Sequence, residues 1–239
     1  MELVKWKYCN PYSNQKYSAT RSFQICGRQV LINQLPEEDI TLDSNTGNVV
    51  WDGAYVMCKY LENVYNWDKL KDCSPPQATC LELGSGTGLA GLTAWLKGVD
   101  VYLSDLPTKT GLLESNIAAN RHIVTAQNFI QAVPLDWERP EESITPDMKF
   151  DLIIGSEIVY YKPLHNSLLK TLILNCQPHH TQVVLSYKPR GLGEEAFFSK
   201  AQAKGFTINK IPQDQLDPEF QQLGGYQVVT LRLEPIKYL

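Results

Sequence analysis

The sequence has no basic block, no long apolar run and no cysteine motif, and each absence excludes a class of protein. The 239 residues carry a formal net charge of −4, so nucleic acid is not the expected partner. No apolar stretch reaches the length of about 18 residues that a membrane helix needs, so no membrane partner is expected. The first ten residues contain charges and lack the apolar centre of a signal peptide.

The six cysteines show neither disulfide nor metal-binding spacing. A disulfide framework is not expected in a chain of this length without a signal peptide. We therefore predict reduced thiols at positions 9, 26, 58, 73, 80 and 176. The adjacent pair His179-His180 is interpreted as part of a solvated turn, so no metal is predicted. These features predict a cytoplasmic protein, with the nucleus as the second expected compartment.

From residue 78 onward, apolar stretches alternate with helical patterns. This alternation predicts an α/β fold: a Rossmann-like, mostly parallel sheet of seven strands with helices on both faces. The last two strands are predicted to pair antiparallel across a long polar loop, residues 212–225. The predicted strands are residues 78–83, 99–104, 127–133, 150–156, 181–187, 206–211 and 226–233. The predicted helices are residues 89–97, 109–120, 164–175 and 194–204.

Residues 1–76 are predicted to be an extension packed on a core, residues 77–239, so that the chain is effectively one domain. Within the extension, residues 22–35 alternate apolar and polar side chains, which is typical of a β-hairpin. Residues 49–61 place apolar side chains near helical spacing. The polar stretch 66–77 is predicted to connect this helix to the core.

A glycine-rich turn follows the first apolar stretch of the core, in the run Leu81-Glu82-Leu83-Gly84-Ser85-Gly86-Thr87-Gly88. Glycine permits positive φ, and the first amides of the following helix are free to bind a polar ligand. The turn suits either NAD or S-adenosylmethionine (AdoMet), because it also contains the dinucleotide pattern Gly86-x-Gly88-x-x-Gly91. Asp105, 19 residues after Gly86, could accept hydrogen bonds from a ribose in both cases or cap a helix.

Three features favour AdoMet. Glu82 could contact the cationic amino end of AdoMet and would repel a pyrophosphate, although a buried acid that binds loop amides is the alternative interpretation. Trp137 follows the third predicted strand, where an indole can stack on adenine or simply pack in the interior. Glu157 and Tyr160 follow the strand 150–156 and would stand at the rim where the transferred group emerges.

In this order the motifs resemble the seven-β-strand AdoMet-dependent methyltransferases. Within that class the chain resembles family 16, which consists largely of protein-lysine methyltransferases. The match runs from residue 49 to residue 161. Its pieces are Val50-Trp51-Asp52, Leu81 to Gly88, Ser104-Asp105-Leu106, Asn116 to Asn120, Leu135-Asp136-Trp137 and Ser156 to Tyr160.

The resemblance implies a cofactor site and a substrate site. AdoMet is the implied cofactor, and its site would be lined by Trp51, Gly84, Ser85, Gly86, Asp105, Trp137 and Ser156. The segment from Glu157 to Tyr160 falls on the family's Asp-x-x-Tyr signature, with Glu in place of Asp. We expect Glu157 to anchor an incoming ammonium, because a carboxylate favours the charged form of an amine. Tyr160 or Tyr161 is expected to form the channel wall and to hold the cation through its ring face.

The implied reaction is methyl transfer to a lysine side chain of a protein. By analogy, the expected substrate is a translation elongation factor or a chaperone, and the enzyme is expected to be a monomer. Acidic residues in two segments expected to flank the cleft would suit a lysine-bearing surface. They are Glu37, Glu38, Asp39, Asp214, Asp217 and Glu219.

Three alternatives stay open at this point. An NAD(P)-dependent oxidoreductase would share the turn, but no convincing catalytic Tyr-x-x-x-Lys or His–Asp arrangement is found. A methyltransferase could instead act on a small molecule, a histidine or an arginine; the absence of Asn-Pro-Pro-Tyr argues only against amide and adenine nitrogens. A non-catalytic binding module is disfavoured because Gly84, Gly86 and Asp105 are all intact.

Overall fold

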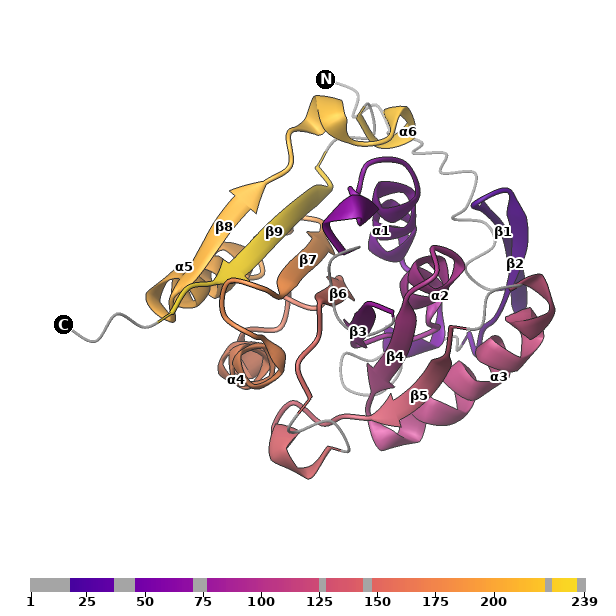
Figure 1. Ribbon diagram of the computed structural model, residues 1–239, viewed down its shortest axis with the longest axis horizontal. Helices are drawn as coiled ribbons and strands as arrows, with labels where there is room; N and C mark the ends of the chain where they lie inside the picture. Colours follow the sequence, from indigo (N-terminus) through magenta and orange to yellow (C-terminus); the bar gives the residue numbers. More distant parts are fainter. Residues whose placement is uncertain are drawn as a thin grey trace, which may run out of the picture.

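A seven-stranded sheet forms the centre of the computed structural model, which describes residues 18–36, 46–70, 77–124, 128–143, 148–221 and 225–235 (Figure 1). Its strands are β3 (Thr79–Leu83), β4 (Asp100–Asp105), β5 (Ile130–Pro134), β6 (Leu152–Ser156), β7 (Gln182–Tyr187), β8 (Phe206–Lys210) and β9 (Gln227–Leu233). Their order across the sheet is β5-β4-β3-β6-β7-β9-β8. β9 pairs antiparallel with both of its neighbours, β7 and β8, and the other neighbouring strands pair parallel. The predicted fold class is confirmed.

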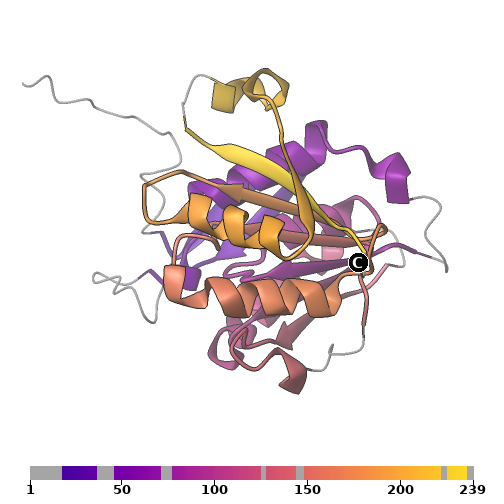
Figure 2. The same cartoon turned by 90° about the vertical axis from the view of Figure 1, so that its left-hand side faces the viewer.

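Helices cover both faces of this sheet, as the predicted alternation requires. One buried cluster of apolar side chains includes residues from α1 (Asp52–Asn63), α2 (Leu89–Leu96) and α3 (Thr110–Asn120). The opposite cluster includes residues from α4 (His165–Asn175) and α5 (Glu194–Ala203), and α5 lies beside β8 in Figure 1, with both helices seen on one side of the sheet in Figure 2. β6 contributes to both clusters, which explains its continuous apolar sequence.

The predicted hairpin is present as β1 (Thr20–Ile25) and β2 (Arg28–Asn33), paired antiparallel beside α3 (Figure 1). Two buried asparagines of α3 bind the free edge of β2. Asn120 Oδ1 accepts the Leu31 N–H at 2.9 Å, and Asn120 Nδ2 donates to the Leu31 carbonyl at 2.7 Å. Asn116 binds the N–H and carbonyl of Asn33 in the same way, at 2.7 and 3.1 Å. Side chains of α3 thereby bind the hairpin through the backbone groups of β2.

The long polar loop predicted over residues 212–225 contains short helical elements in its described part. It contains a 3-10 turn, Gln213–Gln215, and the short helix α6 (Pro218–Gln221). Leu216 and Phe220 are buried, and they join the core cluster that includes α1. Three large apolar residues among many polar ones, Leu216, Phe220 and Leu223, give too weak a pattern for sequence analysis, although the spacing of four between the first two is that of a helix.

Several predicted features fall partly or wholly beyond what the structure describes. Within the predicted connector, residues 67–70 form a 3-10 turn, and residues 71–76 lie outside the described part of the chain. Glu37, Glu38 and Asp39 also lie outside it. Across the described segments, no helix has the length and apolar character needed to span a bilayer.

Candidate active site

The glycine turn after β3 requires glycine for two separate reasons. Gly84, Gly86 and Gly88 have φ angles of 60°, 54° and 81°, in the left-handed region that glycine adopts without steric cost. A Cβ atom on Gly84 would also lie 2.9 Å from Ile158 Cγ2 and 3.2 Å from the Trp137 ring. The segments that follow β6 and β5 therefore meet at this turn.

Asp105, the last residue of β4, is bonded directly to the turn. Its Oδ2 accepts the Gly86 N–H at 2.7 Å, and its Oδ1 accepts the Leu106 N–H at 2.8 Å. Burial raises the pKa of the Asp105 carboxyl, and these two N–H donors oppose that rise. The acid is thus fixed at the carboxyl ends of the strands, where ligands bind in sheets of this type.

A segment preceding α1 covers the other side of the turn. A Cβ atom on Gly86 would lie 3.0 Å from the carbonyl oxygen of Gly47, within the 3-10 turn Thr46–Asn48. Trp51, just before α1, donates its Nε1–H to the Thr46 carbonyl at 2.5 Å. The indole of Trp51 is therefore joined to the glycine turn through this covering segment.

Two serines of the predicted cofactor site have different surroundings. The Ser85 hydroxyl is buried and donates to the Glu82 carbonyl at 3.2 Å. The Ser156 hydroxyl, at the end of β6, is buried and has no hydrogen-bond partner within the described segments. An unpaired buried hydroxyl has a free-energy cost that a bound polar ligand can remove.

Glu82 is buried against the start of α2. Its carboxylate is 2% exposed, and Oε2 accepts the Gly91 N–H of α2 at 3.0 Å. Burial raises the pKa of Glu82 to about 8, against the opposing effect of that N–H donor. This is the placement that the alternative interpretation described, and direct contact of Glu82 with a cofactor stays a prediction.

Glu157 has the most unusual conformation and environment of the predicted residues. Its φ of 57° is left-handed, which is uncommon for a side chain other than Gly, Asn or Asp. Its Oε2 accepts from Arg190 Nη1 at 2.6 Å and from the Lys188 N–H at 3.4 Å. Its Oε1 is buried and lacks a hydrogen-bond partner in the described part of the chain. Burial raises the pKa of the Glu157 carboxyl, and the Arg190 guanidinium counteracts the rise.

Glu157 packs directly against the first turn of α1. A Cβ atom on Gly53 would lie 2.5 Å from Glu157 Cγ and 2.6 Å from Oε1. Ser186, near the end of β7, links these two residues. Its hydroxyl donates to the Gly53 carbonyl at 2.8 Å, and its carbonyl accepts the Glu157 N–H at 2.8 Å. The start of α1 and the ends of β6 and β7 therefore converge on this carboxylate.

Tyr160 is close to Glu157 in the sequence, but the hydrogen bonds to the Glu157 carboxylate come from Arg190 and Lys188. Its ring is half-buried and lies 6.4 Å, centroid to centroid, from that of Tyr161, which is 40% exposed. The role of Tyr160 as a channel wall stays a prediction.

The sequence analysis gave no role to Arg190 or Tyr226, which the structure brings to this region. The Tyr226 hydroxyl donates to Asp52 Oδ2 at 3.0 Å, and Lys188 Nζ lies 5.3 Å from the Tyr226 ring. One signal could have identified the basic pair, because Lys188 and Arg190 follow a buried parallel strand at its carboxyl end.

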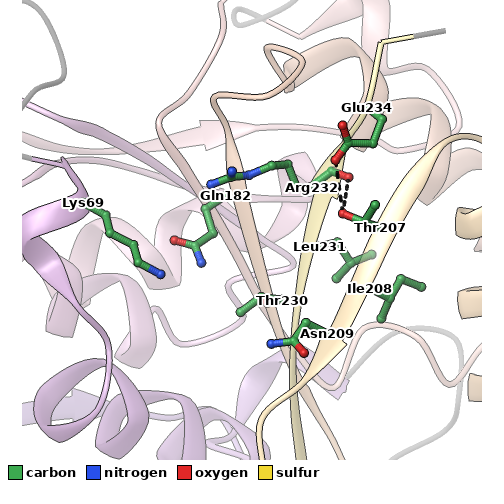
Figure 3. A pocket seen from close by; sticks show the side chains of 9 residues that line it. All are labelled: Lys69, Gln182, Thr207, Ile208, Asn209, Thr230, Leu231, Arg232 and Glu234. Carbon is green, nitrogen blue, oxygen red and sulfur yellow. Dashed lines mark hydrogen bonds between the residues drawn. The ribbon is translucent and has the colours of Figure 1, made fainter. Parts of the chain in front are cut away.

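A separate cavity of about 340 Å³ is lined by residues from β7, β8, β9 and the 3-10 turn before β3 (Figure 3). None of the predicted site residues lines it. Gln182 in its wall is the first residue of β7, so this cavity lies toward the other end of that strand from Arg190. Its lining residues are Lys69, Gln182, Thr207, Ile208, Asn209, Thr230, Leu231, Arg232 and Glu234.

The arrangement around the glycine turn fits a nucleoside cofactor. It offers a turn that a Cβ would obstruct, a carboxylate fixed on the neighbouring strand and an indole against the turn. A solved methyltransferase, the T. thermophilus 16S rRNA N2 G1207 methyltransferase in complex with AdoMet and guanosine, has the same fold. It matches with a TM-score of 0.52 and 15% identity, covering 92% of this chain and 46% of its own. The chain therefore has the seven-strand fold class of this methyltransferase.

Within this class, the chain belongs to the lysine methyltransferase family, whose model matches residues 33–204. EEF1A lysine methyltransferase 3 of Mus musculus is 30% identical over 201 residues, covering 83% of this chain and 79% of the relative. Protein N-lysine methyltransferase METTL21A of Mus musculus is 33% identical over 168 residues, covering 70% and 71%. The chain is an AdoMet-dependent protein-lysine methyltransferase, and the alternatives of an oxidoreductase and a binding module are set aside.

Proposed function

We propose that this enzyme methylates a lysine of a translation elongation factor, and that Glu157 binds the side chain to be methylated. The name of the relative EEF1A lysine methyltransferase 3 supports the substrate. The role of Glu157 is supported by one observation above all: its Oε1 is buried, unpaired within the described residues and located where three chain segments converge. A cation is the partner that such an oxygen lacks.

AdoMet, when bound, supplies a methyl group that is activated by its sulfonium. The residues proposed to hold it are Trp51, Glu82, Gly84, Ser85, Gly86, Asp105, Trp137 and Ser156. In this proposal Asp105 accepts hydrogen bonds from the ribose and Trp137 lies against the adenine. The chain contributes mainly alignment, because a good leaving group needs little further activation.

The attacking amine must be neutral, whereas free lysine has a pKa of about 10.4. Glu157 Oε1 is proposed to receive the substrate as an ammonium and to orient it. Tyr160 and the buried surroundings are proposed to lower the pKa of that amine by excluding water, so that the proton leaves before attack. Solvent is the acceptor of that proton in this scheme.

The proposed substrate also bears on location and assembly. Translation elongation takes place in the cytoplasm, so we place the enzyme there, with the nucleus as the second compartment. We further propose that it acts as a monomer that binds its protein substrate through the acid-bearing loop 212–225. Size-exclusion chromatography with light scattering tests the monomer directly.

The test is transfer of labelled methyl from AdoMet to purified elongation factor, with the modified lysine located by mass spectrometry. Glu157→Ala is expected to lower kcat/KM by about 10- to 100-fold, the value of a hydrogen bond to a charged group. Glu195→Ala, which removes an exposed glutamate of α5, is the control and should retain wild-type kcat/KM. A wild-type kcat/KM in Glu157→Ala would refute the anchor role. Labelling of a chaperone but not of the factor would refute the proposed substrate.

A further inference from the structure

The two carboxylate oxygens of Glu157 have unequal surroundings. Oε2 accepts from the Arg190 guanidinium at 2.6 Å and from the Lys188 N–H at 3.4 Å. Oε1 lies against Gly53 and has no partner in the described segments. One oxygen is therefore already paired with a cation, whereas the other is available.

Arg190 is held in place by its own loop. Glu194, at the start of α5, is 3% exposed, and its carboxylate accepts N–H donors from the backbone of the loop that leads into the helix. Oε1 of Glu194 accepts the Arg190 N–H at 3.1 Å, and Oε2 accepts those of Leu192 and Gly193 at 3.0 and 3.1 Å. This carboxylate fixes the backbone from which the Arg190 guanidinium reaches Glu157.

We propose that Arg190 is a positioning residue that occupies one oxygen of Glu157, so that the substrate lysine meets the other oxygen and only part of the negative charge. This inference rests on the proposed function of Glu157. An unshared carboxylate would hold the substrate amine as an ammonium, which cannot attack a methyl group, because a nearby negative charge raises the pKa of an amine. Sharing the charge with Arg190 preserves binding while allowing the amine to lose its proton.

Other charged and titratable groups around Glu157 are unchanged when Arg190 is replaced. Asp52 on α1 adds negative charge, and its Oδ2 is bonded to the Tyr226 hydroxyl. Lys188 places its ammonium over the Tyr226 ring, 5.3 Å from the centroid. Tyr160 follows on the same segment as Glu157. A change in the pH profile of an Arg190 variant therefore reports the loss of the guanidinium.

The experiment is single-turnover methylation by Arg190→Gln between pH 6 and 10, with saturating enzyme and AdoMet, so that the chemical step is observed. We expect the midpoint of the rate–pH curve to move to higher pH by about one unit, as a lost charge partner implies. The rate below the midpoint should then fall about tenfold and recover at high pH. Arg190→Lys, which keeps a cation, should retain a midpoint near that of wild type.

Arg232→Gln is the matched control. It removes a guanidinium from β9 in the wall of the separate cavity (Figure 3), so net charge changes equally while Glu157 is untouched. Its midpoint should coincide with that of wild type. A merely structural role of Arg190 would instead lower the rate equally at every pH.

The outcomes separate the two proposals. If Glu157→Ala is impaired but Arg190→Gln keeps the wild-type midpoint, the inference on Arg190 is overturned and the anchor role of Glu157 stands. If Arg190→Lys shifts as far as Arg190→Gln, charge sharing is also overturned. If Glu157→Ala behaves as wild type, both proposals fail.

Discussion

Glu82 couples the folded state to pH, because its carboxylate is buried between β3 and α2, where it accepts the Gly91 N–H. Burial raises its pKa from the ordinary value of 4.5 to about 8. The folded protein therefore holds a proton on Glu82 across a pH range in which the unfolded chain has released it. Stability falls with pH wherever the folded state binds more protons than the unfolded state.

Glu82→Gln should remove this pH dependence, because glutamine resembles the protonated acid in shape and can still accept the Gly91 N–H. We expect the wild-type free energy of unfolding, relative to the variant, to be greatest below about pH 4.5 and to decline until about pH 8. The relative loss should be on the order of 3–5 kcal/mol. Urea unfolding at pH 5 and pH 8.5 measures it, with the exposed Glu138→Gln as control. Parallel curves for wild type and Glu82→Gln would contradict the account.

The sequence was more informative about the surroundings of the glycine turn than about those of Glu157. Asp105, Trp137 and the glycines could be predicted because each follows a recognisable strand and meets its neighbours through the geometry of a parallel sheet. Arg190 could not be predicted to pair with Glu157, because that contact depends on the conformation of a loop. The inward direction of Glu82 likewise depends on the approach of α2, which no local pattern specifies.

At the scale of elements, the hairpin is held to the core by side chains rather than by strand pairing. The Leu31 N–H donates to the Asn120 side chain, and the Leu31 carbonyl accepts from it. The N–H and the carbonyl of Asn33 bind the Asn116 side chain in the same way. Both asparagines are fully buried in α3. An asparagine side chain offers a donor and an acceptor, so it can bind a strand edge as a neighbouring strand would.

Asn120→Ala should therefore destabilise the protein by about 2–4 kcal/mol, since it leaves two backbone groups of Leu31 without partners. The Leu31 amide should also lose its protection from hydrogen exchange. Urea unfolding and exchange measured by NMR test the two effects, with Asn209→Ala on the exposed face of β8 as control. A variant as stable as the control, with a protected Leu31 amide, would show that the hairpin is held by its apolar face alone.

The elements themselves were largely predictable, because the apolar strands and the glycines that end α2 and α5 give strong local signals. The predicted helix over residues 109–120 is present as α3. The binding of β2 by Asn116 and Asn120 was not predicted, although both residues belong to the matched motifs. A sequence motif can identify such residues, but it does not reveal their role, because their partners lie more than 80 positions away in the sequence.

At the scale of the whole molecule, the extension and the core share one interior. Phe23 and Ile25 of the hairpin belong to the same buried cluster as residues of α1 and α2 and of the central strands. A segment that depends on a shared core gains little stability on its own. We therefore propose that residues 1–76 and 77–239 unfold together, as the sequence analysis expected of a chain that is effectively one domain.

A cofactor that binds only the folded state should stabilise all of this structure at once. At one hundred times its dissociation constant, S-adenosylhomocysteine should add about 2.7 kcal/mol, which raises Tm by roughly 5–10 °C for a protein of this size. Calorimetry should show one transition, and hydrogen exchange should slow in the hairpin and in β3 alike. The Asp105→Asn variant, which weakens the proposed ribose contact, should show a smaller shift at the same concentration.

A hairpin that melts earlier, at a temperature the ligand does not change, would mean that the extension is a separate unit. In that case the Thr46–Asn48 segment, which covers Gly86, would have to bind the turn without support from the hairpin.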